Sequence, residues 1–436
     1  MALGGGTFVA QNKELPGAYI NFVSASAANA ALSDRGIVTM PLELDWGVEG
    51  KMFEVTGGEF QKNSMAIFGY EYTSDKLKGL RDLFLNAQTL YGYRLNGGGK
   101  KAGNALAEAL YSGVRGNDLK IVVQVNADDE SLFDVKTILG SSVVDEQTVS
   151  KADELTVNAF VKWKSGITLE AAASIPLTGG ENGEASGADH QAYLDQAESY
   201  SFHTMGVVVT DDTTKALYAA CNKRLRDEMG VKFQLVLYDY AKADYMGVIS
   251  VNNKVLDSEC NEASLVYWVT GASAGCAVNK SNQNKKYDGC FMVETPYTQN
   301  QLKEAIRAGK YTFHRVGTEI RVLEDINTMV TTSDTRGDIF KDNQTIRVID
   351  QIGNDIAVLF NTKYLGIVPN DAAGRISLWS DIVAYYRQLE QIQAIEDFSD
   401  SGVTVEPGDT KKSVTVSSEV NVVNAMGKLY MTVTVS

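Results

Sequence analysis

Residues 271–275 read Gly-Ala-Ser-Ala-Gly, the segment of this 436-residue sequence whose residue types and spacing come nearest to an active site. The pattern G-x-S-x-G is typical of the sharp strand-to-helix turn that presents a nucleophilic serine in α/β-hydrolases. Asp288 and His314 follow Ser273 in the chain order that such a triad needs. A serine hydrolase using Ser273 is therefore one functional hypothesis.

The surroundings of Ser273 favour a different interpretation. Residues 263–278 are small and apolar enough for a buried helix, although 265–269 could also form the strand that the turn requires. His314 is the only histidine after Ser273, and it falls inside a predicted strand instead of a loop. We therefore predict a packed helix here and no catalytic residue.

Residues 97–101, Gly-Gly-Gly-Lys-Lys, suggest a phosphate-binding loop at first sight. Such a loop needs a glycine, four further residues and then Gly-Lys-Ser/Thr, so that backbone N–H groups cradle phosphate and a hydroxyl reaches magnesium. Arg94 stands at the first glycine position and Lys101 at the hydroxyl position. The segment therefore predicts a turn and no nucleotide site.

Asp211 and Asp212 stand between a predicted strand and a predicted helix, where α/β folds often place ligands. Acidic side chains at this position also cap the helix and complement its dipole, which is the interpretation we favour.

Cysteine spacing argues against a metal centre or a disulfide framework. The chain has four cysteines with no C-x-x-C pair, and three histidines. This usage is typical of reduced thiols in a cytosolic product. We expect no metal, no cofactor and no enzymatic activity. The cysteines are Cys221, Cys260, Cys276 and Cys290.

The charge balance narrows the class of partner. With 40 Lys and Arg against 55 Asp and Glu, the net charge is −15, and no dense basic run occurs. Neutralising phosphates requires clustered cations, so we expect no nucleic-acid partner. The longest uncharged stretch, 263–278, is shorter than the roughly 20 residues of a membrane span. Residues 1–8 lack the features of a secretory signal.

The elements around these motifs fall into regions with different periodicities. A helix over 189–199, a strand over 204–209, a helix over 213–229 and a strand over 233–238 predict a right-handed βαβ unit with parallel strands. Short β-rich runs separated by polar turns come before it and predict an inserted all-β module. These runs are 135–139, 143–149, 156–163 and 169–176, and a separate apolar strand is predicted over 119–125 before them.

Two smaller regions flank this centre. Ser74 can cap a helix that reaches residue 87, with a strand following at 91–95, and 102–110 has helix-forming composition. After the centre, a capping box at Thr298 and Gln301 begins a helix that ends at Gly309.

The last third predicts a hairpin and two helices. The hairpin over 311–316 and 319–323 turns at Gly317. Two amphipathic helices then carry apolar stripes from Ile349 to Leu359 and from Leu378 to Ile392.

Both ends of the chain are strand-like. Residues 16–22 predict a strand after a glycine-rich arm, and the last eight residues alternate apolar and polar side chains with high β-propensity. Terminal residues fray unless they are held, so the C-terminal strand should pair with something.

Taken in order, these features resemble the family of contractile phage tail sheath proteins and R-type bacteriocin sheath subunits. The matching stretches are 16–19 (Pro-Gly-Ala-Tyr), 113–119 (Gly-Val-Arg-Gly-Asn-Asp-Leu), 177–180 (Leu-Thr-Gly-Gly), 274–281 (Ala-Gly-Cys-Ala-Val-Asn-Lys-Ser), 286–289 (Lys-Tyr-Asp-Gly) and 322–328 (Val-Leu-Glu-Asp-Ile-Asn-Thr), with the paired helices up to Phe398.

The resemblance implies an α+β multidomain fold: an α/β sheath core with an inserted all-β domain, a small N-terminal mixed domain, and a C-terminal α+β assembly domain with strand-exchanging termini. It places a strand where 102–110 looks helical, and a helix around Ser273. The expected domains are a 1–24 exchange arm, a 25–100 mixed domain, a middle domain from 101–126 and 187–310, an inserted β domain over 127–186, and an assembly domain over 311–436.

The resemblance also implies a mechanical function. Such subunits stack as six-membered rings around an inner tail tube, lend their chain ends to neighbours, and shorten to drive the tube through a cell envelope. Baseplate and tail terminator proteins are the other implied partners, with assembly in the bacterial cytoplasm before the sheath joins a phage tail or a released particle.

The implied strand-exchange residues are Tyr19, Ile20, Phe22, Leu429, Met431, Val433 and Val435, and Arg387 and Glu390 are candidates for facing the tube. A non-contractile tail or shell protein stays open as an alternative, beside the hydrolase.

Overall fold

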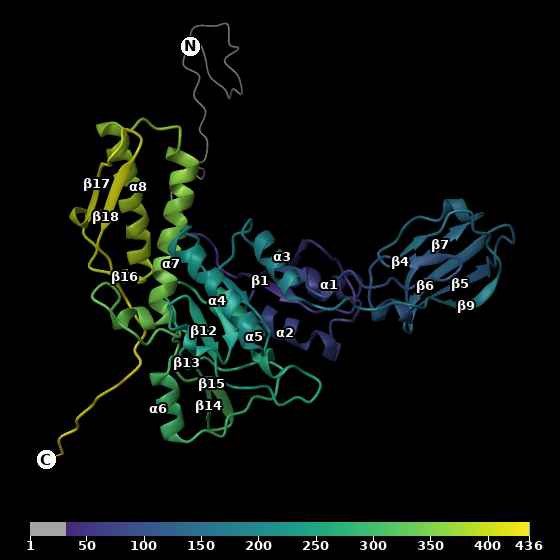
Figure 1. The fold of residues 1–436 in the computed structure, drawn as a ribbon, viewed down its shortest axis with the longest axis horizontal. Helices are drawn as coiled ribbons and strands as arrows, with labels where there is room; N and C mark the ends of the chain where they lie inside the picture. Colours follow the sequence, from purple (N-terminus) through teal and green to yellow (C-terminus); the bar gives the residue numbers. More distant parts are fainter. Residues whose placement is uncertain (1–31, 436) are drawn as a thin grey trace, which may run out of the picture. The chain divides into compact units, whose positions relative to one another are not determined.

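The computed structural model describes residues 32–435 and divides into two compact units, each considered by itself (Figure 1). The larger unit contains Asp34–Asp350 together with residues 424–435, and the smaller contains Gln351–Val423 together with residues 32–33. No helix within 32–435 has the length and apolar composition needed to cross a membrane.

A seven-stranded sheet forms the centre of the larger unit, in the order β13-β12-β11-β10-β1-β3-β2. All neighbours are parallel except β2 and β3, which are antiparallel. The strands are β1 (Ile37–Leu42), β2 (Met52–Thr56), β3 (Thr89–Arg94), β10 (Thr204–Gly206), β11 (Gln234–Tyr238), β12 (Val248–Val251) and β13 (Lys310–Tyr311).

Helices cover both faces of this sheet. Val236 belongs to an apolar cluster with residues of α1, α2 and α5, whereas its neighbours Leu235 and Leu237 belong to a second cluster with α3 and α4. Successive side chains of a strand point to opposite faces, so a parallel sheet buried on both sides reads as a continuous apolar run. The helices are α1 (Gly57–Phe68), α2 (Lys78–Phe84), α3 (Gly187–Ala197), α4 (Asp212–Asp227) and α5 (Leu265–Gly275).

The predicted βαβ unit is confirmed, because β10 and β11 are parallel neighbours joined through α4. The predicted capping box also forms: Thr298 and Gln301 begin α6 (Gln299–Arg307). The hairpin at Gly317 is confirmed as β14 (Phe313–Val316) and β15 (Glu319–Val322).

The β-rich region forms a four-stranded antiparallel sheet, β7-β6-β5-β9, and a separate pair, β4-β8. These strands bury a third apolar cluster, which also includes Trp46 from the loop after β1. They are β4 (Ala107–Ala109), β5 (Leu119–Val125), β6 (Phe133–Leu139), β7 (Ser142–Val149), β8 (Val161–Trp163) and β9 (Ala172–Pro176).

The helix predicted over 102–110 from its composition is wrong. Ala107 and Ala109 are buried and Glu108 is exposed, which is the alternation of a strand, and β4 pairs with β8. Alanine favours helices, but pairing with a neighbouring strand and burial of one face outweigh that propensity. The resemblance had placed a strand here.

Some strands pair across the boundaries of the expected domains. β4 and β5 lie in 107–125, which we assigned to the middle domain, yet they pair with strands of the inserted β region. The seven-stranded sheet takes strands from both the expected mixed domain and the expected middle domain. The domain boundaries stay a prediction.

The smaller unit consists of helices and two strand pairs, β17-β18 and β16-β19, both antiparallel. The two predicted amphipathic helices are confirmed as α7 (Asn343–Leu359), which begins in the larger unit, and α8 (Ala372–Gln391). The strands are β16 (Ile395–Glu396), β17 (Val403–Pro407), β18 (Val414–Ser418) and β19 (Asn421–Val422).

Candidate assembly site

The G-x-S-x-G segment forms no catalytic turn. Ser273 lies inside α5 with 0% of its surface exposed, whereas a nucleophile turn needs the serine between a strand and a helix. Asp288 accepts a hydrogen bond from Trp268 Nε1 at 2.8 Å, and His314 lies in β14. The hypothesis of a hydrolase built on this motif is therefore wrong.

The two glycines of the motif explain why the pattern occurs. A Cβ at Gly271 would lie 2.2 Å from the carbonyl oxygen of Leu83, and one at Gly275 would lie 2.1 Å from that of Asn86. Both carbonyls belong to the end of α2 and the turn after it, so α5 packs there backbone against backbone. As predicted, the small residues serve helix packing.

The other motifs singled out in the sequence also have structural partners. Asp211 caps α4 by accepting the backbone N–H of Thr214 at 2.8 Å, and this hydrogen bond lowers the pKa of its carboxyl. Lys100, in the glycine-rich turn, pairs with Glu181 at 2.9 Å. The favoured interpretations, a capping residue and a turn, are confirmed.

The four cysteines carry free thiols. Among residues 32–435, no group of three or more His, Cys, Asp or Glu side chains is arranged to hold a metal ion.

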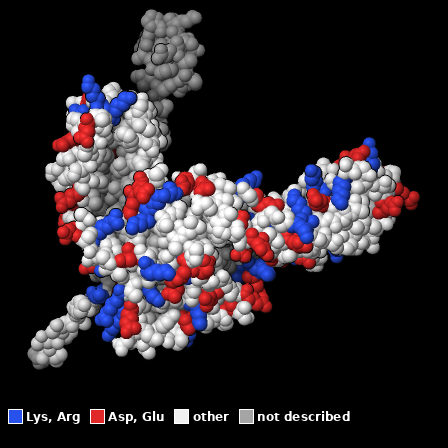
Figure 2. All heavy atoms as spheres, in the orientation of Figure 1, with Lys and Arg blue, Asp and Glu red and all other residues white. Residues whose placement is uncertain are grey.

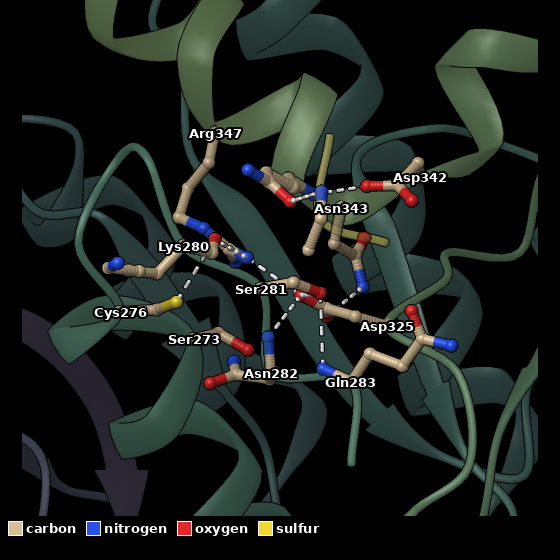
Figure 3. Close-up of polar contacts among 12 residues, drawn as sticks. Ser273, Cys276, Lys280, Ser281, Asn282, Gln283, Asp325, Asp342, Asn343 and Arg347 are labelled. Atoms are coloured by element: carbon tan, nitrogen blue, oxygen red, sulfur yellow. Dashed lines mark hydrogen bonds and ion pairs between the residues drawn. The ribbon is translucent and has the colours of Figure 1, made fainter. Parts of the chain in front are cut away.

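Two stretches behind the resemblance meet around Asp325 (Figure 3). The Asp325 carboxylate, from 322–328, accepts the backbone N–H of Asn282 at 2.9 Å and a hydrogen bond from Ser281 Oγ at 3.3 Å. From α7 the same carboxylate accepts hydrogen bonds from Arg347 Nη2 at 2.7 Å and from Asn343 Nδ2 at 3.0 Å. Asp325 therefore joins the loop after α5 to the first turn of α7.

A second aspartate determines how α7 begins. Asp342 Oδ1 accepts the backbone N–H of Gln344 at 2.7 Å and that of Thr345 at 3.4 Å, as a helix N-cap does. Burial, together with the nearby Asp325 carboxylate, raises the pKa of Asp342 from 3.8 to about 6. Sequence reasoning missed this role, although an aspartate directly before an amphipathic helix is the usual signal for a cap.

Residues 424–435, which we call the C-terminal arm, form no helix and no strand. The predicted exchange residues on it are exposed, from 67% at Val433 to 89% at Val435, with Leu429 and Met431 between these values. Tyr430, on the other side of the alternating pattern, is 89% exposed. A segment with strong β-propensity thus leaves its apolar side chains uncovered.

The smaller unit offers strand edges of the matching kind. Within residues 32–435, β17 and β18 pair only with each other, so each keeps an outer edge without a strand partner. Tyr19, Ile20 and Phe22, predicted to exchange at the other chain end, lie outside the described residues.

Arg387 and Glu390, the two candidates for facing the tube, bind other residues of the smaller unit. Arg387 forms an ion pair with Asp400, and Glu390 accepts the backbone N–H of Phe398 at 3.0 Å. Both side chains thus tie the end of α8 to the loop that follows it.

Four family models match consecutive parts of the chain. The tail sheath protein Gp18 domain III N-terminal region matches 35–95, the phage tail sheath protein beta-sandwich domain matches 96–182, the central domain matches 183–328 and the C-terminal domain matches 335–436.

Individual proteins match over 94% or more of this chain. The phage-like element PBSX protein XkdK of Bacillus subtilis (strain 168) is 32% identical over 470 residues, covering 100% of both chains. The crystal structure of a sheath tail protein from Desulfitobacterium hafniense has a TM-score of 0.82 and 36% identity, covering 94% of this chain and 97% of that one. The contracted helical sheath of the anti-feeding prophage shares the fold, with a TM-score of 0.58 and 12% identity over 97% of this chain and 99% of that one. This chain belongs to the phage tail sheath protein family.

Proposed function

We propose that this subunit polymerises as stacked six-membered rings around an inner tail tube, and that the polymer shortens to drive the tube through a cell envelope. The C-terminal arm carries this proposal, because it is an exposed strand-forming segment without a strand partner among residues 32–435. Assembly would store the energy for shortening in the lattice, so the subunit needs no catalytic residue.

The arm would bind by adding a strand to a neighbouring copy. Strand addition satisfies the backbone groups of both segments, and alternate side chains provide the specificity. Leu429, Met431, Val433 and Val435 would cover apolar surface on the receiving copy, where an edge of the β17-β18 pair is a suitable acceptor. At the other chain end, Tyr19, Ile20 and Phe22 would be exchanged in the same way.

Charge must be accommodated in such a lattice. The subunit carries −15, and Figure 2 shows acidic and basic side chains interspersed on the face that it draws. Copies in contact therefore need complementary patches between them, or an inner tube of opposite local charge. Arg387 and Glu390 stay candidates for that tube contact. Tube, baseplate and terminator proteins are the proposed partners, in a particle assembled in the bacterial cytoplasm.

Removing the arm tests the proposal. A variant lacking residues 429–436 should keep its thermal midpoint and circular dichroism spectrum but form no polymer in sedimentation or negative-stain microscopy. The matched control changes Thr432 and Thr434 to Ser, which leaves the apolar positions intact and should preserve polymer formation.

Polymers from the shortened variant would contradict strand exchange by the arm. Tubes of a single diameter under all conditions would instead favour the alternative of a non-contractile tail or shell protein.

A further inference from the structure

We propose that Gln344 and Thr345, in the first turn of α7, form a latch that holds the root of the C-terminal arm and so sets the direction in which residues 429–435 leave the subunit. This inference rests on the proposed strand exchange and adds to it the residues that aim the exchanged segment.

The latch is made of direct contacts between α7 and the arm. Gln344 Oε1 accepts the backbone N–H of Ala425 at 2.9 Å, and Thr345 Oγ1 donates to Asn424 Oδ1 at 3.2 Å. Both α7 side chains belong to residues that are 2% exposed, whereas Asn424 and Ala425 are exposed. Buried polar groups of α7 therefore meet the arm at its first two residues.

One further contact and one charge interaction follow the same path. Gly427 lies against Gln283, whose Nε2 would be 3.1 Å from a Cβ placed on the glycine. Burial raises the pKa of the Glu324 carboxyl, and the nearby Lys428 ammonium opposes that rise. The arm thus follows the protein surface from residue 424 to 428 before its exposed apolar positions begin.

The latch residues are themselves held rigidly. Asp342 caps the backbone N–H groups of Gln344 and Thr345, and Asn343 Oδ1 accepts Gln234 Nε2 at 2.8 Å. The Asp325 carboxylate accepts hydrogen bonds from Asn343 and Arg347 in the same part of α7 (Figure 3). Because both ends of this first turn are fixed, the two latch side chains present their polar atoms to the arm in one direction.

A fixed root matters for the rate of assembly. A free segment must lose conformational entropy when it binds, and its effective concentration at a distant edge falls as the tethered length grows. Holding residues 424–428 shortens the freely moving part to the residues that exchange. The latch should therefore speed polymer growth without contributing to the exchanged strand.

The experiment compares full-length variants that break the latch hydrogen bond from the helix or from the arm. Gln344→Met removes the acceptor from the helix, and Ala425→Pro removes the donor from the exposed arm, where the subunit fold does not depend on it. Met426→Ala is the matched control, since Met426 lies between the contacts and is fully exposed. Hydrogen exchange of residues 424–428 is measured on dilute monomer, and polymer growth by light scattering at higher concentration.

Gln344→Met should raise exchange at Ala425 roughly fivefold, the factor that corresponds to a net hydrogen bond of about 1 kcal/mol. Both latch variants should slow polymer growth by about tenfold, while Met426→Ala should behave like the original chain. Unchanged exchange in Gln344→Met would overturn the latch contact. Faster hydrogen exchange at Ala425 with an unchanged rate of polymer growth would overturn the role of the latch in assembly. That outcome is independent of strand exchange itself, which the deletion of 429–436 tests.

Discussion

Arg347 and Asp325 form an ion pair that is almost completely shielded from solvent, with 2.7 Å between Nη2 and Oδ2 and 1% of each side chain exposed. The pair joins α7 to the segment 322–328, and hydrogen bonds from Asn282 and Asn343 complete the carboxylate's surroundings. A buried pair of this kind need not stabilise a fold more than apolar residues would, but removing one partner leaves a buried charge uncompensated.

Asp325→Ala should therefore lower the free energy of unfolding by about 3–5 kcal/mol, because the Arg347 guanidinium keeps its burial and loses its counter-charge. Thermal or denaturant unfolding of the monomer checks this value. The control is Lys242→Ala, which breaks the exposed pair between Lys242 and Asp212 and should have a much smaller effect, because solvent screens this pair. Equal effects of the two changes would show that the Asp325 pair does not hold α7 in place.

Ser273→Ala should leave folding and assembly unchanged, because Ser273 Oγ is buried and makes no hydrogen bond. Gly275→Ala in the same helix should destabilise the subunit by about 1–3 kcal/mol or more, since its Cβ would meet a backbone carbonyl that cannot easily move. Thermal midpoints of the two variants check this contrast. A fluorophosphonate probe should not label Ser273 in the folded chain, and labelling would contradict the burial of this side chain.

The pH dependence of stability should contain a contribution from Asp342. Its pKa is raised from 3.8 to about 6 in the folded chain, so between these values the folded state binds a proton that the unfolded state has released. This contribution to stability is fully present below about pH 4 and is lost as the pH rises through 6, with a magnitude on the order of 1–3 kcal/mol.

Asp342→Asn keeps a side-chain oxygen that can accept the backbone N–H groups of Gln344 and Thr345, but the amide side chain does not titrate. The stability of the original chain relative to Asp342→Asn should therefore fall between pH 4 and pH 7, as measured by thermal midpoints at several pH values. A difference that stays constant across this range would show that Asp342 titrates with an ordinary pKa.

Local sequence patterns correctly predicted much of the fold. The βαβ unit around α4, the capping box of α6, the hairpin at Gly317 and the two long amphipathic helices all follow from periodicity and terminal residues, which act within a few positions of the chain. Residues 102–110 could not be predicted in this way, because their strand depends on pairing with β8, more than fifty residues later.

Local residue patterns were enough to predict the helix packing around Ser273 and to exclude a phosphate-loop motif at 97–101, and they predict a strand in the C-terminal arm, where residues 424–435 form none within the subunit. Each of these follows from residue types at short spacing. The packing of distant elements revealed that Asp325 joins the loop after α5 to α7, and that Gln344 and Thr345 contact the root of the arm. Those contacts link residues up to 81 positions apart, and the distance between such residues depends on how the elements pack, which no local pattern records.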